Sequence, residues 1–243
     1  LADAKEAITK MAEYVTEQNT QKWLDQIQSW KEEHPLTMKD RKLMSPLDII
    51  SEINRQFDEA ILVTDVGQHQ MLVAQYAELT PKKHLIMSGG LGTMGYGLGA
   101  SIGAKIGRPE KTVINIAGDG CFRMNMNEIA TAARYNVPVI EVVMNNHVLG
   151  MVRQWQTLFY GKRYAQTILN DAVDFVKLAE AMGAVGMRVE KMEDFGPAFQ
   201  KALELGRPVV LDCVIAEDDK VFPMVPAGAA ITEVFDQDDM KEE

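Results

Sequence analysis

Residues 112–120 read TVINIAGDG, and residues 139–146 read VIEVVMNN. Each stretch begins with a short apolar run, which is typical of a strand buried on both faces, and ends in small or polar residues. Asn146 follows Asp119 by 27 positions, enough for a turn, a helix and a returning strand. The two stretches therefore predict neighbouring parallel strands, with Asp119 and Asn146 at their carboxyl ends.

The same alternation of strands and helices continues along the chain. Further short apolar strands are expected at 61–64, 85–87, 184–189 and 208–215. Helices are expected at 45–57, 124–135, 149–158, 172–182 and 194–205. This pattern predicts an α/β fold, a doubly wound and mostly parallel sheet with helices on both faces.

Three segments are predicted. Residues 1–44 hold two amphipathic helices (the first across 3–18) and a charged linker at 39–42, and we interpret them as the helical end of an upstream domain. Residues 45–215 form the α/β domain, and residues 216–243 form a C-terminal arm with an acidic tail. Because the first residue is Leu1, we expect the chain to be part of a longer protein.

Composition excludes several classes of function. The 243 residues carry a net charge of −10 with a pI near 5.0, which argues against binding to nucleic acid. Apolar runs stay below membrane-spanning length, so no membrane partner is expected. Two cysteines, Cys121 and Cys213, are too few for a disulfide framework and favour the cytoplasm.

Glycines concentrate between Gly89 and Gly107, which hold eight of the 18 in the chain. Four of them recur at every fourth position from Gly95, forming a smooth helical stripe that favours close packing over chemistry. Residues 90–95 (GLGTMG) also match the dinucleotide motif G-x-G-x-x-G. We disfavour that alternative because Asp119 starts its own glycine-flanked turn and because Asn145 and Asn146 would be left without a role.

The polar residues at the two strand ends predict a site for a metal and a diphosphate. Asp119, Asn146 and the carbonyl of Val148 are hard oxygen donors suited to Mg²⁺. Gly118 and Gly120 let backbone amides approach a phosphate, next to a helix amino terminus. Alone, Gly-Asp-Gly is an ordinary turn and Asn-Asn an ordinary helix cap; their spacing is what favours the site.

The pair resembles the signature of enzymes that use thiamine diphosphate (ThDP), which runs from Gly-Asp-Gly to Asn-Asn. Three further stretches narrow the resemblance: residues 66–71 (VGQHQM), 88–96 (SGGLGTMGY) and 149–156 (LGMVRQWQ). They are similar to the catalytic subunit of the acetolactate (acetohydroxyacid) synthase family. The resemblance covers residues 45–230, and residues 1–40 are similar to the end of that family's middle domain.

The resemblance implies roles for matching residues. Asp119, Asn146 and Val148 match the Mg²⁺ ligands, and Met94 matches the residue that bends the cofactor into a V shape. Trp155 matches a residue that shapes the pocket of the acceptor 2-ketoacid. The other implied cofactor contacts are Gln68, His69, Gly92, Gly118, Gly120, Cys121, Leu149, Gly150 and Met151.

Two of these assignments carry alternatives. His69 could bind on the phosphate side, which we favour, or relay a proton. Cys121 departs from the more usual serine, and without a basic partner it is a buried small residue rather than a nucleophile.

The family joins pyruvate, after loss of CO₂, to a second 2-ketoacid for branched-chain amino-acid synthesis. The resemblance further implies FAD in the full-length enzyme, a homodimer or tetramer and a possible small regulatory subunit. The glutamate that activates the cofactor is expected on a domain outside this chain, so no catalytic residue is assigned here. We therefore expect this chain alone to bind ThDP–Mg²⁺ weakly and to form no acetolactate.

Two other readings of the sequence remain open. One is a different ThDP-dependent decarboxylase or carboligase, such as glyoxylate carboligase or a two-chain decarboxylase; the segments at 66–71 and 149–156 count against it. The other is a non-catalytic binding module, which would have no need for metal ligands such as Asp119 and Asn146.

Overall fold

A computed structural model describes residues 1–36, 43–169, 173–237 and 239 of the chain. By contacts it divides into two compact units, Leu1–Lys39 and Asp40–Glu243, which are described separately below. The predicted linker at 39–42 and most of the acidic tail lie outside the described residues.

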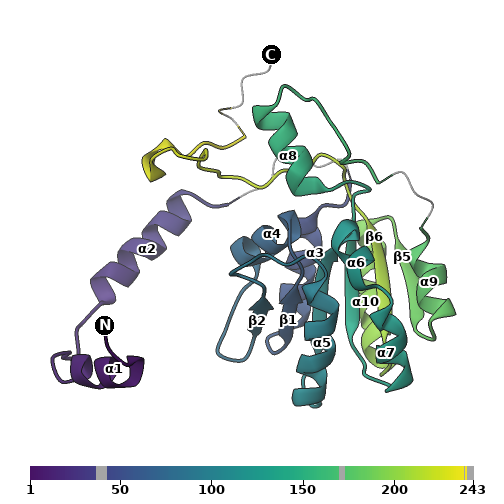
Figure 1. Ribbon diagram of the computed structural model, residues 1–243, viewed down its shortest axis with the longest axis horizontal. Helices are drawn as coiled ribbons and strands as arrows, with labels where there is room; N and C mark the ends of the chain where they lie inside the picture. The colour runs from purple at the N-terminus through teal and green to yellow at the C-terminus, as the bar shows by residue number, and fades with distance from the viewer. Residues whose placement is uncertain (37–42, 170–172, 238, 240–243) are drawn as a thin grey trace. The chain divides into compact units, whose positions relative to one another are not determined.

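The second unit is built on one six-stranded parallel sheet (Figure 1). Its spatial order is β2-β1-β3-β4-β6-β5. The strands are β1 (Ile61–Thr64), β2 (His84–Met87), β3 (Val113–Gly118), β4 (Ile140–Asn145), β5 (Val185–Val189) and β6 (Val209–Val214). Strands β3 and β4 are neighbours, with Gly118 opposite Met144, as the sequence predicted.

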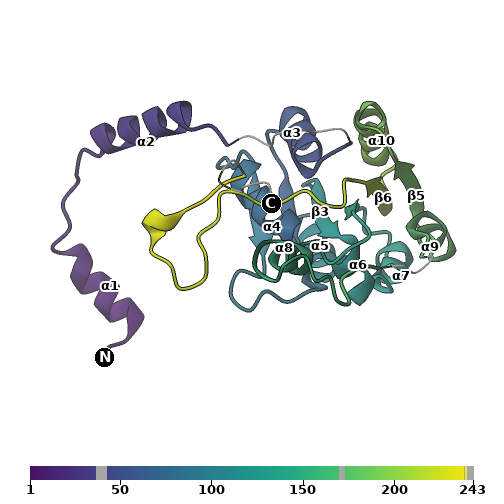
Figure 2. The same ribbon diagram turned by 90° about the horizontal axis from the view of Figure 1, so that it is seen from above.

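Helices cover both faces of this sheet, which confirms the predicted fold class. They are α3 (Pro46–Gln56), α4 (Gln68–Tyr76), α5 (Tyr96–Gly107), α6 (Asp119–Asn125), α7 (Glu128–Arg134), α8 (Gly150–Phe159), α9 (Phe175–Ala181) and α10 (Met192–Glu204). Figure 2 shows α3 and α10 on one side of the sheet and α5, α7 and α9 on the other. Ser45 caps α3 through Asp48, ahead of Pro46 in the first turn.

The core lies on both faces of the central strands, which are buried along almost their whole length. On the α5 side, Phe122 and Phe175 meet edge to face with ring centroids 5.3 Å apart. On the α10 side, Phe195 and Phe199 stack at 5.4 Å. Burial of each such ring contributes roughly 1.5–3 kcal/mol, so the sheet is a rigid base for the loops at its carboxyl edge.

The structure differs from the prediction in three helices. The single helix expected at 124–135 is two short ones, because α6 already begins at Asp119 and the chain turns at Met126 before α7. Helix α4 was not predicted, since its apolar residues show little periodicity. The first helix, α1 (Ala4–Ala12), is shorter than the expected 3–18.

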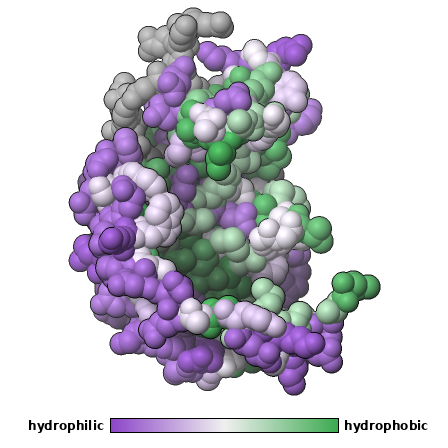
Figure 3. Space-filling view, turned by 90° about the vertical axis from the view of Figure 1, so that its left-hand side faces the viewer, coloured by the Kyte–Doolittle hydropathy of each residue, from purple (hydrophilic) through white to green (hydrophobic). Residues whose placement is uncertain are grey.

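The first unit consists of α1 and α2 (Gln21–Glu33), and neither helix buries a residue. Trp23 and Trp30 of α2 contact each other edge to face at 5.5 Å, yet both remain exposed. Exposed apolar side chains also occur in the second unit, and Figure 3 shows green apolar groups among purple hydrophilic ones on one face of the protein.

A C-terminal arm follows β6 and is tied to the α/β body by backbone contacts. The amide of Ala216 donates to the carbonyl of Met44 at 3.3 Å, and Val221 is fully buried. Further along, Met224 and Phe235 form an isolated antiparallel bridge. No helix within the described ranges is long and apolar enough to cross a membrane.

One buried acid makes the stability of this fold depend on pH. Glu141 of β4 is fully buried and accepts bonds from Asn115 Nδ2 at 2.9 and 2.8 Å. Burial raises its pKa to about 8; the bond from Asn115 lowers it and the charge of Asp65 raises it. The stability contributed by this proton is complete below the ordinary pKa of 4.5 and is lost as the pH rises through about 8.

Replacing Glu141 with glutamine should remove this loss. We expect the free energy of unfolding of Glu141→Gln, relative to the unchanged protein, to rise by up to ~1.4 kcal/mol per pH unit within that window. Urea denaturation at about pH 5 and about pH 8 measures the difference. Equal differences at the two pH values would contradict it.

Candidate functional site

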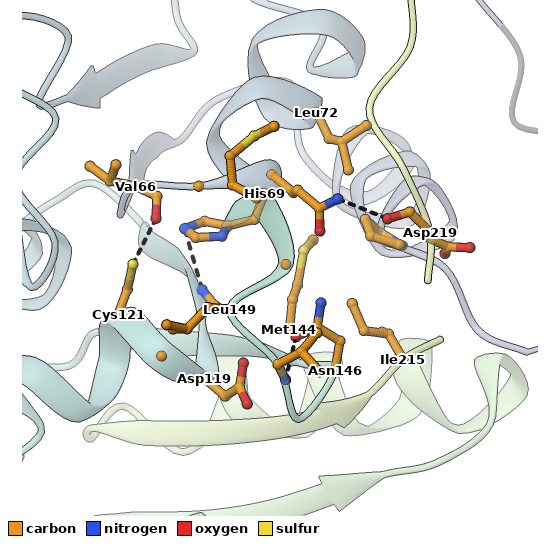
Figure 4. A pocket seen from close by; sticks show the side chains of 18 of the residues that line it. Val66, His69, Leu72, Asp119, Cys121, Met144, Asn146, Leu149, Ile215 and Asp219 are labelled. Atoms are coloured by element: carbon orange, nitrogen blue, oxygen red, sulfur yellow. Dashed lines mark hydrogen bonds between the residues drawn. The ribbon is translucent and has the colours of Figure 1, made fainter. Parts of the chain in front are cut away.

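A pocket opens at the carboxyl ends of β1, β3 and β4 (Figure 4). Connections leave β1 towards β2 on one side and β3 towards β4 on the other, so this edge is the topological switch point where open α/β sheets bind ligands. Asp119 and Asn146 lie on the lower side in the view, with His69 and Leu72 above. The lining residues are Pro46, Val66, Gly67, Gln68, His69, Leu72, Met94, Gly118, Asp119, Gly120, Cys121, Met144, Asn146, Val148, Leu149, Gly150, Met151, Val152, Ile215, Ala216 and Asp219.

Asp119 has a buried carboxylate, one oxygen of which lacks a hydrogen-bond partner. It is 1 % exposed, and its Oδ2 has no hydrogen-bond partner. Burial raises its pKa to about 7, although the charge of Arg123 and bonds from backbone amides, including those of Gly120 and His147, act to lower it. An acceptor oxygen in this state fits a cation, which would supply the missing compensation.

Asn146 and Val148 bring two neutral oxygens to the same wall of the pocket. Asn146 Oδ1 accepts the Val148 amide at 3.2 Å and keeps a second lone pair. Val148 bridges to Ile168 through the bonds of its neighbours, Leu149 N to Thr167 O and Leu169 N to His147 O. In such a bridge the carbonyl of Val148 points away from the partner segment, so it is available to a ligand.

This mixture of a carboxylate, an amide oxygen and a carbonyl suits Mg²⁺ better than a softer metal. Among the described residues, no three His, Cys, Asp or Glu side chains gather as metal ligands. The donor set therefore fits the ion that the sequence predicted, with phosphate and water oxygens to complete six positions.

Two glycines in the wall of the pocket leave no room for a side chain. A Cβ on Gly120 would lie 2.6 Å from Leu149 Cδ2, and one on Gly150 would lie 2.9 Å from Asn146 Nδ2. Gly150 is the first residue of α8, whose N-cap Leu149 offers no side-chain bond to the first-turn amides. Open amides at a helix amino terminus are a suitable cradle for a diphosphate.

Gln68 and His69, at the start of α4, line the pocket, and both also form hydrogen bonds to other residues of the protein. His69 Nε2 accepts the Gly118 amide at 3.3 Å, and burial lowers the pKa of His69 to about 4, so its ring is neutral at physiological pH. Gln68 Nε2 donates to Gln154 Oε1 at 2.7 Å and to the carbonyl of Asp219 at 2.8 Å.

Asp65, which the sequence reasoning did not single out, fixes the segment that carries Met94. Its carboxylate is 1 % exposed and accepts the amides of Gly95 at 2.8 Å and Gly97 at 3.1 Å. The Gly95 carbonyl in turn accepts from Asn125 Nδ2 at 2.8 Å. The sequence does hold a signal for this contact, because an acid follows a strand and a later helix begins with several glycines whose amides need an acceptor.

Cys121 is buried and donates its thiol to the carbonyl of Val66 at 2.7 Å. Burial raises the pKa of this thiol, the nearby charge of Asp65 adds to the effect, and a neutral packed thiol results. The side chain therefore has the character expected from the sequence, a small buried residue.

Two predicted residues lie outside this pocket. Gly92 is not among its lining residues; it is exposed and adopts a φ of 61°. Trp155 lines a neighbouring hollow with Gln156, Tyr160 and Arg163. Met151 and Val152 line both hollows, so the two adjoin along α8.

The C-terminal arm forms one wall of the pocket, through Ile215, Ala216 and Asp219. Gln154 of α8 holds it in place: its amide donates to the carbonyl of Val221 at 3.0 Å and accepts the Val221 amide at 2.9 Å. Gln154 belongs to the stretch 149–156, but this contact was missed because nothing in the local sequence indicates a partner 67 positions away.

Comparison with known proteins shows the family of this chain. Residues 65–213 match the family described as thiamine pyrophosphate enzyme, C-terminal TPP binding domain. The chain is 40 % identical over 236 residues to the acetolactate synthase large subunit of Cyanidium caldarium, covering 95 % of this chain and 40 % of that protein. It is 42 % identical over 216 residues to the mitochondrial acetolactate synthase of Schizosaccharomyces pombe, covering 86 % of this chain and 32 % of that protein.

The fold is shared with a solved structure. The thiamine diphosphate-dependent 4-hydroxybenzoylformate decarboxylase of Rhodococcus jostii RHA1 superposes with a TM-score of 0.68 at 24 % identity, covering 76 % of this chain and 34 % of that one. The chain spans about 40 % or less of the length of the relatives named here. The chain thus belongs to the thiamine pyrophosphate enzymes, and residues 65–213 are its C-terminal TPP-binding domain.

Proposed function

We propose that this chain forms the diphosphate and Mg²⁺ half of the active site of an acetolactate synthase. The observation that carries the metal assignment is the unpartnered Oδ2 of buried Asp119, beside Asn146 and Val148 in one pocket. The identity of 40–42 % with acetolactate synthases favours that reaction over other ThDP chemistry.

In this proposal each group has a separate task. Asp119, Asn146 Oδ1 and the Val148 carbonyl would hold Mg²⁺, and the open amides at Gly120 and Gly150 would face the diphosphate. Met94, held through Asp65, would support the central part of the cofactor, and Trp155 would shape the hollow for the 2-ketoacid. When bound, ThDP supplies the stabilisation of carbanions that the reaction needs.

The neutral state of His69 favours a supporting role over proton transfer. With a pKa of about 4 it gains no proton at physiological pH, and its Nε2 already accepts the Gly118 amide. We propose that His69 fixes the backbone that faces the phosphate.

The activity is tested on a complete protein that includes the upstream part found in the relatives. With pyruvate, ThDP and Mg²⁺ it should form acetolactate, and with added 2-ketobutyrate it should form acetohydroxybutyrate. Acetaldehyde as the sole product, or turnover of glyoxylate, would instead indicate another decarboxylase or carboligase. The 243-residue chain alone should bind ThDP–Mg²⁺ weakly and form no acetolactate.

The same preparation tests what the resemblance implies beyond this chain. Flavin absorbance would indicate FAD, and the mass in solution would distinguish a homodimer or tetramer from a monomer. A cytoplasmic location is proposed because both cysteines are buried and neither forms a disulfide.

A further inference from the structure

A buried carboxylate outside the pocket has both of its oxygens committed. Asp212 of β6 is 0 % exposed. Its Oδ1 accepts from Asn145 Nδ2 at 2.9 Å, and its Oδ2 accepts from Arg188 Nε at 3.1 Å and Nη2 at 3.0 Å. Arg188 belongs to the edge strand β5 and also donates to Asp174 Oδ1 at 3.3 Å. Arg188 thus compensates the buried charge of Asp212 at Oδ2, while Oδ1 faces Asn145 at the end of β4.

Asn145, the partner of Asp212, is the last residue of β4 and directly precedes Asn146. Its side chain is a two-sided amide that is 4 % exposed. Because Nδ2 is used by Asp212, Oδ1 faces the other way and accepts the His147 amide at 3.3 Å. The direction of this amide is therefore set by Asp212.

The His147 amide lies in the loop that carries two of the proposed metal ligands. It also acts to lower the pKa of the third, Asp119. His147 has a φ of 60°, a left-handed conformation that a residue other than glycine keeps only where its surroundings hold it. On either side of it stand Asn146 and Val148, so a change at His147 moves both oxygens relative to Asp119.

We propose that Asp212, together with Arg188, is a positioning residue for the Mg²⁺ site. It acts through Asn145, whose amide orientation sets the conformation of residues 145–149. The inference rests on the proposed function, since it concerns the same metal site. A carboxylate is required because Arg188 and Asn145 both donate, from opposite sides, and only a carboxylate offers an acceptor to each.

This requirement predicts an unusual pattern of substitutions. In Asp212→Asn the single oxygen turns to the charged Arg188, so an NH₂ group faces Asn145; the Asn145 amide then reverses and the bond to His147 is lost. Removing the competing donor with Arg188→Met frees that oxygen for Asn145. The double variant should therefore bind Mg²⁺ better than the single Asp212→Asn variant, although it has lost one more native contact.

The experiment uses the complete protein and measures the dissociation constant of Mg²⁺ at saturating ThDP by tryptophan fluorescence, with melting temperatures in parallel. Asp212→Asn should weaken Mg²⁺ binding by ~10-fold, as for other residues that support metal ligands, whereas Arg188→Met and the double variant should stay within about 3-fold of the unchanged protein. Asp174→Ala is the matched control: it removes the cap of α9 and the outer partner of Arg188, so it should lower the melting temperature and leave Mg²⁺ affinity unchanged.

Each outcome decides the proposal. If the unchanged protein gives no Mg²⁺-dependent response to ThDP, the proposed function fails and not merely this inference. If it responds but Asp212→Asn binds Mg²⁺ equally well, or if affinity falls with melting temperature across all four variants, Asp212 is only structural. Should Asp212→Asn not fold, Asn145→Ala tests the same bond, and normal Mg²⁺ affinity in that variant would overturn the inference.

Discussion

Replacing Asp119 with asparagine is expected to remove Mg²⁺-dependent ThDP binding and, at the same time, to stabilise the cofactor-free protein. The carboxylate is the only charged donor among the three proposed ligands, so its loss should weaken binding by ~100-fold or more, beyond the effect of supporting residues. Calorimetric titration of ThDP with and without Mg²⁺ measures this loss.

The gain in stability follows from the pKa of the same group. Burial raises the pKa of Asp119 to about 7 from its ordinary 3.8. The stability that this proton contributes to the metal-free fold is therefore complete below 3.8 and is lost as the pH rises through about 7. Asparagine avoids the buried charge, and we expect about 1–3 kcal/mol of added stability at about pH 8 in the absence of metal.

Glu141→Gln is the matched control, because it also neutralises a buried acid with a raised pKa but lies outside the pocket. It should stabilise the cofactor-free protein and leave ThDP binding unchanged. Unaltered Mg²⁺ dependence in Asp119→Asn, against this control, would show that Asp119 is not a metal ligand.

The meeting of Asp119 and Asn146 could be predicted from sequence for a topological reason. In a parallel sheet the carboxyl ends of neighbouring strands share an edge, so residues that follow two such strands come together whatever the details of packing. The apolar runs before each residue are long enough to identify the strands, and β3 and β4 pair as expected. How the loops then fold around these ends depends on contacts that local patterns do not reveal.

The roles of Asp65 and Asp212 could not be predicted from the sequence. Asp65 holds amides 30 and 32 positions away, and Asp212 holds Asn145 across 67 positions. Taken alone in the sequence, Asp65 is an acid that follows an apolar strand and Asp212 an acid within one. The role of each depends on which donor faces it, and that is fixed only when the whole sheet has assembled.

A C-terminal arm was predicted, but its place in the wall of the pocket was not. The contact between Gln154 and Val221 also spans 67 positions. It is made by the side-chain amide of Gln154 with the backbone of Val221. Such a contact has no periodicity in sequence. The early start of α6 was missed for a more local reason: Gly120, a poor helix former, stands in the first turn of a helix that begins at Asp119.

Replacing Gly150 with alanine should block diphosphate binding without unfolding the domain. The added Cβ would come within contact distance of the Gln68 carboxamide oxygen and 2.9 Å of Asn146 Nδ2, inside the proposed cradle. The Asn146 side chain would have to move, and the first-turn amides of α8 would be screened. We expect affinity for ThDP–Mg²⁺ to fall by ~10-fold or more, about 1.4 kcal/mol. The neighbouring atoms are ends of flexible side chains, so the free energy of unfolding should change by less than ~1 kcal/mol.

Gly99→Ala in α5 separates this effect from the general effect of alanine on a helix. A Cβ at Gly99 meets no atom within 4 Å, so the variant should gain ~0.5–1 kcal/mol of stability and bind ThDP–Mg²⁺ normally. Titration calorimetry and urea denaturation on both variants give the comparison. If Gly150→Ala bound the cofactor as tightly as Gly99→Ala does, the diphosphate would not approach the amino terminus of α8. The proposal would then have to place the diphosphate elsewhere along the pocket, beside Gly120 and the start of α6.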